Sequence, residues 1–190
     1  MQPALFLAAF PPEIAALDPS FERATIGVGL VEASLGAAAV IAERGPRHVV
    51  LIGTVGAYPS SGLEIGDVVT AERVLVASPS GAIVEAMPSS APATPIANAR
   101  RVVVATTLSI TTDDVVAASL EKETGAHVEH LEAFAVARAC ERAGVKFSAV
   151  FGVANIVGSR GREEWREHHE RAAAAACAIF RSPTTTPSPA

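Results

Sequence analysis

An amide, two arginines and the only tryptophan follow one strongly apolar stretch of this chain. Asn155 comes directly after the run Phe147–Ala154, and Arg160, Arg162 and Trp165 follow in a segment broken by glycines. A buried amide needs partners for both its oxygen and its nitrogen. Asn155 therefore either makes structural hydrogen bonds to neighbouring segments or recognises a ligand edge that carries a donor and an acceptor. The arginines and the tryptophan form either a surface cation–π cluster or the wall of a site that grips a flat polar ring.

Acidic side chains at two other places could act on a ligand. Glu13 lies in the first turn of a predicted helix, just after the first predicted strand. There it either complements the helix dipole or serves as a general base at the carboxyl edge of the sheet. The segment Glu129–Glu132 follows a short apolar strand and opens another predicted helix. The two glutamates either form an N-terminal capping box, or Glu132 points into a cleft and accepts hydrogen bonds from a vicinal diol.

Two glycine-containing segments follow predicted strands. Residues 53–56, Gly-Thr-Val-Gly, are expected to form a turn at a strand end that offers backbone N–H groups and one hydroxyl. Residues 27–29, Gly-Val-Gly, have the spacing that opens a dinucleotide-binding motif. Glu32 stands where the third glycine of that motif belongs and would repel a pyrophosphate. We therefore predict no dinucleotide site, and we expect no cofactor.

Alternating strands and helices must position these side chains. The expected strands are Leu5–Ala9, Ala24–Val28, Val49–Ile52, Asp67–Val76, Arg101–Thr106 and Phe147–Val153. The expected helices are Pro11–Leu17, Val31–Arg44, Asp113–Glu123, Leu131–Ala143 and Glu163–Phe180. Residues 78–98, rich in Pro, Ser and Ala, are expected to form a loop. The order predicts an α/β fold: one domain, residues 1–180, with a mixed, largely parallel sheet flanked by helices, and a disordered tail at 181–190. Ligands bind such sheets at the carboxyl ends of the strands.

The composition excludes several classes of function. The formal net charge is −5 and no basic stripe is present, so we expect no nucleic-acid partner. Cys140 and Cys177 lie in alanine-rich helical segments with no CxxC pair or Cys/His cluster, so we expect packing thiols and no metal site. The run Ala4–Phe10 lacks the preceding basic residue of a signal peptide, and Ala172–Phe180 is too short to span a bilayer. We expect no membrane partner and a cytoplasmic location.

Taken together, these segments resemble the purine nucleoside phosphorylase and nucleosidase superfamily over nearly the whole ordered length. The matching segments are Ala8–Glu13, Gly27–Gly29, Ile52–Gly56, Ile65–Val69, Glu129–Glu132 and the strand that ends at Asn155. Within the superfamily, Asn155 followed by Val157, Arg160, Arg162 and Trp165 is similar to futalosine hydrolase. The methylthioadenosine/adenosylhomocysteine nucleosidases normally have an aspartate at the position of Asn155 and lack the arginines and the tryptophan that follow. The Glu-x-x-Glu segment also looks like the futalosine hydrolase form, although Leu131 and Ala133 replace its methionine and glycine.

The resemblance implies a hydrolase that cleaves the N-glycosidic bond of a purine nucleoside. The implied substrate is futalosine and the products are hypoxanthine and dehypoxanthinyl futalosine, in menaquinone biosynthesis. By analogy Glu13 activates the attacking water, Glu132 binds the 2′ and 3′ hydroxyls, and Asn155 hydrogen-bonds the base. An amide donates to a 6-oxo group but is a poor general acid, which favours hypoxanthine over adenine as the leaving base. The other implied substrate-binding residues are Thr54, Val55, Gly56, Ser109, Leu131, Arg160 and Trp165.

Water is the implied acceptor of the ribosyl group. Phosphorylases of the superfamily place an arginine just before the Gly-Thr-x-Gly segment, whereas this chain has Ile52 there, and the segment Gly27–Gly29 contains no arginine. A phosphate would therefore meet few cationic partners. The chain also lacks room between Glu13 and Gly27 for extra strands that the family usually has, so the expected fold is trimmed near the N-terminus.

Three points stay open beside this interpretation. The chain is alternatively a methylthioadenosine/adenosylhomocysteine-type nucleosidase, or another purine nucleosidase or phosphorylase. It is also consistent with a non-catalytic relative that binds a nucleoside. By analogy with the family we expect a homo-oligomer, with a dimer as the default.

Overall fold

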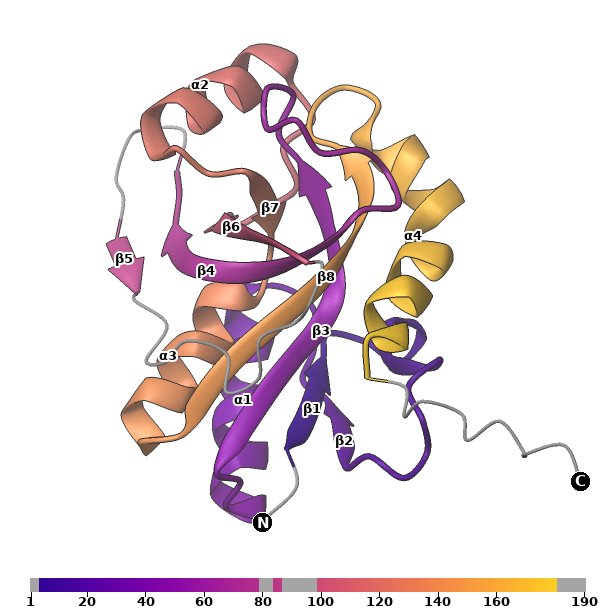
Figure 1. Cartoon of the computed structure of the whole chain (residues 1–190). Helices are drawn as coiled ribbons and strands as arrows, with labels where there is room; N and C mark the ends of the chain where they lie inside the picture. The colour runs from indigo at the N-terminus through magenta and orange to yellow at the C-terminus, as the bar shows by residue number, and fades with distance from the viewer. Residues whose placement is uncertain (1–3, 79–83, 87–98, 181–190) are drawn as a thin grey trace, which may run out of the picture.

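The core of the molecule is one mixed sheet in which most neighbouring strands run parallel (Figure 1). The structure is a computed structural model that describes residues 4–78, 84–86 and 99–180. The strands are β1 (Leu5–Ala8), β2 (Arg23–Thr25), β3 (His48–Ala57), β4 (Val68–Val76), β5 (Val84–Ala86), β6 (Arg100–Thr106), β7 (Val128–His130) and β8 (Lys146–Ile156). The pairs β1–β2, β1–β3, β3–β8, β4–β6 and β6–β7 are parallel, whereas β3–β7, β4–β5 and β4–β8 are antiparallel. The predicted fold class is confirmed.

Strands β3, β8, β4, β6 and β7 pair in a closed ring. The ring closes where the last residues of β3 pair with β7, which places Gly56 opposite Glu129. On its other side Gly56 lies opposite Asn155 of β8, after a register shift between Val55 and Gly56. The ring thus brings a carboxyl group and an amide to the two sides of one glycine.

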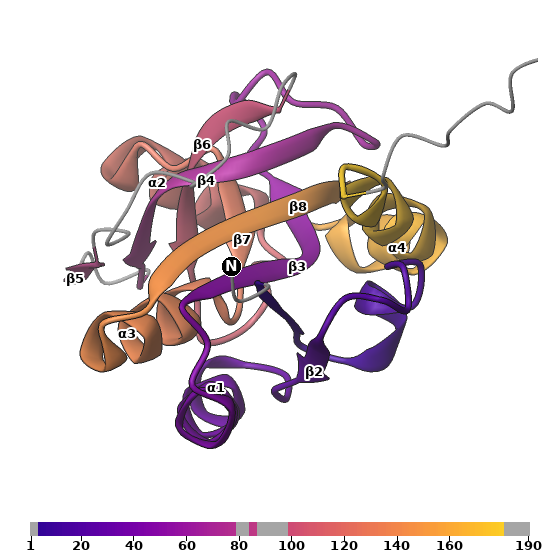
Figure 2. The same cartoon turned by 60° about the horizontal axis from the view of Figure 1, so that its bottom comes forward.

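Helices cover the sheet on two sides (Figures 1 and 2). Helices α1 (Leu30–Arg44) and α3 (Ala133–Ala143) pack against each other on one side, while α4 (Gly161–Ala178) packs on β8, β3 and the short 3-10 helix η1 (Pro11–Ile14). Helix α2 (Asp114–Thr124) lies above the ends of the strands in Figure 1. None of these helices combines the length and the apolar composition that crossing a membrane requires, within the part of the chain that the structure describes.

Glycine at position 152 of β8 allows helix α4 to pack directly on the backbone of this strand. A Cβ atom at Gly152 would overlap the backbone carbonyl of Ala172. The small residues Ala172, Ala173 and Ala176 are buried along the same face of the helix. Alanine and glycine at the contact allow the two backbones to approach, and the second half of α4 therefore packs directly on β8.

Most elements lie where the sequence predicts them, with small differences at their ends. The predicted helix Pro11–Leu17 is only the 3-10 turn Pro11–Ile14, and residues 15–22, which join it to β2, contain no strand. The predicted strand Ala24–Val28 is shorter, since β2 ends at Thr25 and positive φ angles follow at Gly27 and Gly29.

The segment Gly53–Gly56 is not a turn, as the sequence suggested, but part of strand β3. It pairs with β8 as far as Ala57, and its residues are buried. Its glycines leave space for side chains from neighbouring elements, as described below, and do not break the strand.

The stretch 78–98, predicted as a loop, contains the short strand β5, which pairs antiparallel with β4. The remainder of that stretch, residues 79–83 and 87–98, lies outside the described residues. The tail at 181–190, for which disorder was predicted, also lies outside them.

Candidate active site

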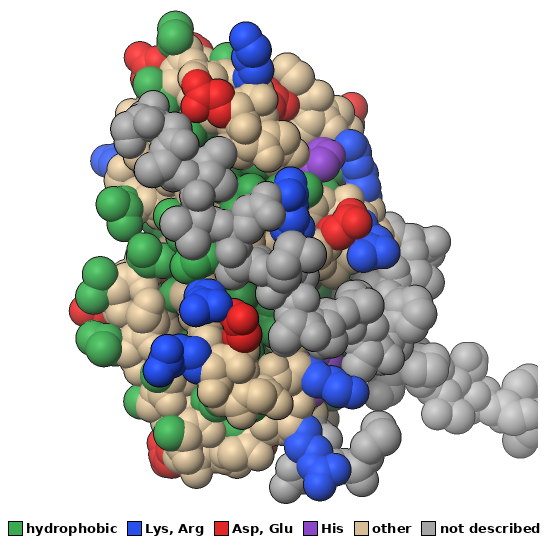
Figure 3. Space-filling view, turned by 90° about the vertical axis from the view of Figure 1, so that its left-hand side faces the viewer, with side chains coloured by type: hydrophobic (Ala, Val, Ile, Leu, Met, Phe, Trp, Pro, Cys, Tyr) green, Lys and Arg blue, Asp and Glu red, His purple; other side chains and the backbone are tan. Residues whose placement is uncertain are grey.

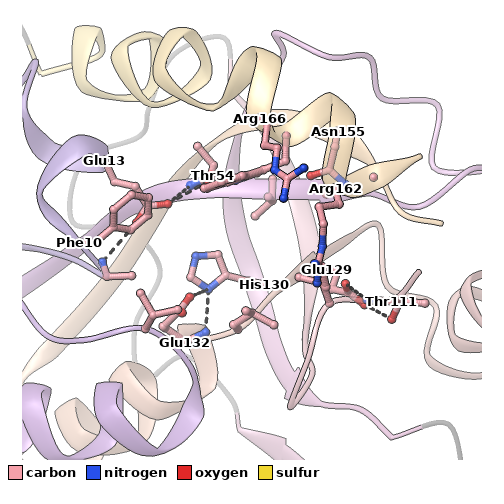
Figure 4. Close-up of a pocket in the computed structure, with 18 residues that line it drawn as sticks. Phe10, Glu13, Thr54, Thr111, Glu129, His130, Glu132, Asn155, Arg162 and Arg166 are labelled. Carbon is pink, nitrogen blue, oxygen red and sulfur yellow. Dashed lines mark hydrogen bonds and ion pairs between the residues drawn. The ribbon is translucent and has the colours of Figure 1, made fainter. Parts of the chain in front are cut away.

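A pocket of about 420 Å³ lies where the ends of β1, β3, β7 and β8 meet (Figure 4). Its walls come from segments far apart in the sequence, including η1, the turn before α1, the segment before α2 and the first turns of α4. The residues that line it are Ala9, Phe10, Glu13, Val28, Thr54, Val55, Gly56, Ile110, Thr111, Glu129, His130, Leu131, Glu132, Asn155, Gly161, Arg162, Trp165 and Arg166. Most of the residues that the sequence singled out are thus brought together.

Glu13 is a buried carboxyl group held by three donors. Its Oε1 accepts hydrogen bonds from the backbone N–H and the hydroxyl of Thr54, each over 2.9 Å, and its Oε2 accepts from the backbone N–H of Ala9 over 3.2 Å. Burial, together with the nearby Glu132 carboxyl group, raises the pKa of Glu13 from an ordinary 4.5 to about 7, although the hydrogen bonds from Thr54 and Ala9 act in the opposite direction. A carboxyl group with this pKa exchanges protons readily near neutral pH.

Gly53 makes room for that carboxyl group. A Cβ at position 53 would lie 3.1 Å from Oε1 of Glu13, and the carboxyl carbon would be 3.3 Å away. The next residue, Thr54, supplies the two donors to Oε1. Gly53 and Thr54 thus have roles that the sequence alone did not indicate. Gly53 leaves space for the carboxyl group of Glu13, and Thr54 donates two hydrogen bonds to it.

Glu132 lies directly before α3 and reaches across to the glycine turn that precedes α1. Its Oε1 accepts a hydrogen bond of 2.6 Å from the backbone N–H of Gly29. Its Oε2 lies 3.1 Å from Nδ1 of His130. This second contact is not an ion pair. Burial lowers the pKa of His130, and Nδ1 already accepts hydrogen bonds from the backbone N–H groups of Glu132 and Ala133, each over 3.0 Å. Two acceptor atoms therefore face each other.

The capping box considered for Glu129 and Glu132 is not formed. The side chain of Glu132 makes no capping hydrogen bond to α3, and the imidazole of His130 accepts from the first N–H groups instead. Helix α3 accordingly begins at Ala133, two positions after the predicted start at Leu131. The alternative in which Glu132 points into a cleft is the one that the geometry matches, since Glu132 lines the pocket.

Asn155 is half-buried between two glycines. Its Nδ2 donates to the backbone carbonyl of Ile156 over 3.1 Å, which fixes the orientation of the amide because a carbonyl oxygen only accepts. A Cβ on Gly56 would lie 2.8 Å from Nδ2, and a Cβ on Gly161 would lie 2.9 Å from it. Asn155 lines the pocket, and its second N–H and its Oδ1 are a donor and an acceptor beyond the bond to Ile156.

Trp165 and Arg160, both predicted to bind substrate, lie in different environments. Trp165 lines the pocket, with its ring stacked on His169 at 4.2 Å between centroids, and its Nε1–H donates to the Thr54 hydroxyl over 3.1 Å. The Arg160 side chain is 78% exposed and pairs with Glu164 over 3.1 Å, outside the lining of the pocket. Ser109, also predicted, is exposed and is not among the lining residues.

Glu129 and Arg166 line the pocket although the sequence analysis did not predict them as site residues, whereas Arg162 was considered there as part of the wall of a site. Glu129 is buried, which raises its pKa, and it accepts hydrogen bonds from the backbone N–H of Thr111 over 2.9 Å and from its hydroxyl over 2.5 Å. This pair ties β7 to the segment before α2. Arg162 and Arg166 line the pocket from one face of α4, and their spacing of four residues is the signal that could have shown that they share a face.

No group of His, Cys, Asp and Glu side chains within residues 4–78, 84–86 and 99–180 is arranged to hold a metal ion. The polar groups that line the pocket are carboxyl, amide, hydroxyl, imidazole, indole and guanidinium groups. They suit proton transfer and hydrogen bonding to a polar ligand.

Solved structures with the same fold include two kinds of nucleosidase. A futalosine hydrolase mutant from Helicobacter pylori strain 26695 superposes with a TM-score of 0.81 at 17% identity, covering 95% of this chain and 97% of the other. A 5′-methylthioadenosine/S-adenosylhomocysteine nucleosidase from Colwellia psychrerythraea 34H, in complex with adenine, gives 0.75 at 18% identity and covers 94% and 93%. The corresponding nucleosidase from Helicobacter pylori gives 0.80 at 18% identity, with 94% and 96% covered.

Comparison with curated proteins gave no match. The model of one protein family, described as the phosphorylase superfamily, matches residues 24–182. That span holds every lining residue of the pocket except Ala9, Phe10 and Glu13. The family model covers most of the chain, and the chain therefore belongs to the phosphorylase superfamily.

Proposed function

We propose that the protein is a hydrolase that cleaves the N-glycosidic bond of a purine nucleoside, with futalosine as its substrate and hypoxanthine as the released base. The observation that carries the proposal is the convergence of Glu13, Glu132 and Asn155 on one pocket. Cleavage of such a bond passes through a state with positive charge on the ribose and negative charge on the departing base. Carboxylates near the sugar and an amide near the base match that distribution of charge.

Glu13 is the proposed general base. Its pKa of about 7 lets it take a proton from water near neutral pH, and when ionised it stabilises the positive charge that develops on the ribose. Its burial among fixed donors keeps the carboxylate in one position. A general base needs such a fixed position if the water molecule is to attack from a defined direction.

Glu132 is the proposed partner of the 2′ and 3′ hydroxyls. Its Oε1 is occupied by the N–H of Gly29, whereas its Oε2 faces another acceptor, Nδ1 of His130. A sugar hydroxyl that donates to Oε2 would supply the hydrogen missing from that contact. The same geometry supports a neutral, hydroxyl-bearing ligand over an anion at this end of the pocket.

Asn155 is the proposed partner of the base. Because its orientation is fixed by Ile156, its remaining N–H can donate to a 6-oxo group or a ring nitrogen while Oδ1 accepts from a ring N–H. Hypoxanthine offers such a pair of groups. An adenine-releasing nucleosidase of the methylthioadenosine type remains the second candidate, supported by the similar fold of enzymes of that name.

Water is the proposed acceptor of the ribosyl group. The N–H of Gly27 is bound to the carbonyl of Ala9 and that of Gly29 to Glu132, so the glycine turn has these two amides engaged inside the protein. Ile52, at the position where the phosphorylases carry an arginine, is fully buried in the core between the sheet and α4. A phosphate near Glu13 would also meet two carboxyl groups, which disfavours it electrostatically.

The arginines of α4 favour futalosine over simpler nucleosides. Futalosine is a hypoxanthine nucleoside whose ribose carries an aryl carboxylate, whereas inosine and methylthioadenosine have no such anion. Arg162 and Arg166 line the pocket, and within the described residues neither forms an ion pair with a carboxylate. A guanidinium group binds a carboxylate through charge-assisted, often paired hydrogen bonds.

A nucleoside panel tests the proposal. Purified protein is incubated with futalosine, inosine, methylthioadenosine and adenosylhomocysteine, with and without phosphate, and the released base is separated by chromatography. We expect hypoxanthine from futalosine at a rate that phosphate leaves unchanged. Faster release of adenine from methylthioadenosine would favour the second candidate, and a rate that depends on phosphate would make the protein a phosphorylase. Ligand-induced thermal stabilisation without release would identify a non-catalytic binder.

A homo-oligomer, a dimer by default, and a cytoplasmic location are also proposed. Large apolar side chains are exposed in two segments of the described chain: Val28, Val31 and Leu35 in the first, and Leu108, Ile110 and Val115 in the second. Val28 and Ile110 both line the pocket, so both segments border it. Hydrophobic side chains also reach the surface among charged ones on the face in Figure 3. Sedimentation of the protein and of Leu35→Glu tests whether these segments associate.

A further inference from the structure

The single tryptophan of the chain donates its indole N–H within the protein. Nε1 of Trp165 donates to Oγ1 of Thr54 over 3.1 Å, and the Thr54 hydroxyl donates to Oε1 of Glu13 over 2.9 Å. The three residues come from α4, β3 and η1. A row of two hydrogen bonds therefore connects helix α4 to the carboxyl group that we propose as the general base.

The chemistry of the donors fixes the direction of this row. An indole nitrogen only donates, so the Thr54 hydroxyl must accept from Trp165. The hydroxyl has one hydrogen, which it gives to Glu13. The indole N–H occupies one of the two acceptor positions of this oxygen, which leaves the hydroxyl fewer ways to accept from water or from a protonated Glu13. Trp165 thus keeps Thr54 in the role of donor, and successive hydrogen bonds in such a row strengthen one another.

The row makes the two oxygens of Glu13 inequivalent. Oε1 accepts both the N–H and the hydroxyl of Thr54, each over 2.9 Å. Within the described chain, Oε2 accepts only the N–H of Ala9, over a longer 3.2 Å. A carboxylate oxygen with more donors carries less available negative charge, so Oε2 is the more basic oxygen.

The indole ring is held from both sides, which fixes the direction of its N–H. His169 stacks on it at 4.2 Å with an angle of 19° between the planes, and Phe10 lies at 6.2 Å from it, inclined by 44°. The imidazole of His169 also hydrogen-bonds the carbonyl of Trp165 over 3.0 Å, and this carbonyl requires Nδ1 to be the donor. A phenylalanine at position 165 would preserve the packing but not the donor.

We propose that Trp165 is a positioning residue for proton transfer. Its N–H holds the Thr54 hydroxyl as a donor to Oε1 of Glu13, and this leaves Oε2 as the atom that takes the proton from water. The O–H bond of the water breaks, its oxygen forms the bond to the ribose carbon, and the bonding electrons of the N-glycosidic bond leave with the base. The catalytic part of the proposal rests on the proposed function, whereas the hydrogen-bond row does not.

The titratable and charged groups around the row determine how it must be tested. His169 stacks on the indole from α4 itself, and Arg162 and Arg166 line the same pocket from that helix. Glu132 and the neutral His130 face the pocket from the start of α3 and the end of β7. The Sγ of Cys177 lies 3.5 Å from the backbone carbonyl of Glu13. Of these groups His169 is the one in ring contact with the indole, so it must be replaced by a ring that does not titrate.

The first experiment observes the row without any substrate. Since the chain has one tryptophan, the indole N–H gives one signal in a ¹H–¹⁵N correlation spectrum. In a His169→Phe background we expect this signal to shift with pH with a midpoint of about 7, the pKa of Glu13. The shift should disappear with Glu13→Gln and with Thr54→Val and persist with Thr54→Ser. A signal that does not titrate, or that still titrates in Glu13→Gln, would overturn the proposal.

The second experiment is a double-mutant cycle in kinetics. Trp165→Phe should lower kcat about threefold to tenfold, as expected for the loss of one hydrogen bond, with little change in KM. In a Thr54→Val background Trp165→Phe should have no further effect on kcat, because its route to Glu13 is already absent. Additive effects, or an effect on KM alone, would mean that the ring only packs against the ligand.

The two experiments separate this inference from the proposed function. A wild-type protein without nucleosidase activity contradicts the proposed function, and the spectroscopic titration then decides alone whether Trp165 is coupled to Glu13. An active protein whose indole signal is insensitive to Glu13 contradicts only the role of Trp165.

Discussion

The carboxyl group of Glu132 and the backbone N–H of Gly29 are joined by a hydrogen bond of 2.6 Å, although the two residues lie 103 positions apart in the sequence. The bond holds the glycine turn before α1 against the start of α3. It orients Glu132 by one oxygen and leaves the other directed at His130. One side chain thus both fastens two helix starts together and borders the pocket beside Glu13.

Replacing Glu132 by glutamine should change the pH dependence of the reaction in a defined direction. After burial, the Glu132 carboxylate is the main influence that raises the pKa of Glu13. Without that charge Glu13 ionises more easily, so the acidic limb of log kcat against pH should move to lower pH. KM for futalosine should rise about tenfold, the effect expected for a lost charge-assisted hydrogen bond to a hydroxyl. An acidic limb that moves to higher pH would contradict this assignment.

Replacing Glu13 by glutamine should abolish activity and change how stability depends on pH. The folded-state pKa of about 7 lies above the ordinary value of 4.5, so Glu13 disfavours the folded state progressively as pH rises from 4.5 to 7. The full effect corresponds to about 3 kcal/mol. Denaturant unfolding should therefore show Glu13→Gln gaining stability relative to wild type between pH 5 and pH 8. We expect kcat to fall at least about 100-fold.

A constant difference in unfolding free energy between these two proteins across that pH range would mean that Glu13 is ionised in the folded protein at pH 5. Activity retained by Glu13→Gln would remove Glu13 from the reaction altogether.

Replacing Gly56 by alanine should damage the base-binding end of the pocket. The new Cβ would lie 2.8 Å from both Nδ2 of Asn155 and Cγ2 of Val157, so the amide must move. We expect overpacking to cost about 1–3 kcal/mol of stability. We also expect kcat/KM to fall at temperatures where the variant is fully folded, because the amide of Asn155 is displaced. Gly45→Ala is the matched control, because Gly45 has a positive φ of 56° but nothing within 4 Å of its Cβ. The control should lose stability and keep its kcat/KM at temperatures where it is folded.

Replacing Arg162 or Arg166 by glutamine should affect substrates with a carboxylate and spare those without one. For futalosine we expect KM to rise about tenfold to a hundredfold, in the range of one hydrogen bond to a charged group, whereas KM for inosine should stay within about twofold. Arg171→Gln, an exposed substitution on the same helix outside the pocket lining, controls for the loss of positive charge. Equal effects on both nucleosides would remove the arginines from carboxylate recognition.

The sequence predicted the site best where chemistry coincides with a strand end. Glu13 follows β1 and Asn155 lies at the end of β8, so the rule that ligands bind at the carboxyl ends of strands was sufficient to expect them together. The interpretation failed where long-range contacts override local signals. The glycines at 53 and 56 indicated a turn, yet pairing with β8 keeps them in β3, and their missing side chains accommodate Glu13 and Asn155.

Residues whose partners are distant in the sequence could not be predicted. Glu129 was considered only as a helix cap, because nothing local indicates that Thr111 donates to it twice. Trp165 was expected to contact a ligand through its ring. Its N–H reaches Thr54, 111 positions away, and only the folded arrangement of α4 on β3 reveals that contact.

The absence of a side chain at Gly152 ties one wall of the pocket to the sheet. The backbone of α4 lies against β8 at that point, so the helix that carries Trp165, Arg162 and Arg166 packs directly on the strand that ends beside the pocket at Asn155. Two other lining residues are exposed apolar side chains: Val28 is 55% exposed and Ile110 is 39% exposed. In a dimer of the kind proposed above, burial of these side chains would place part of the partner subunit directly beside the pocket.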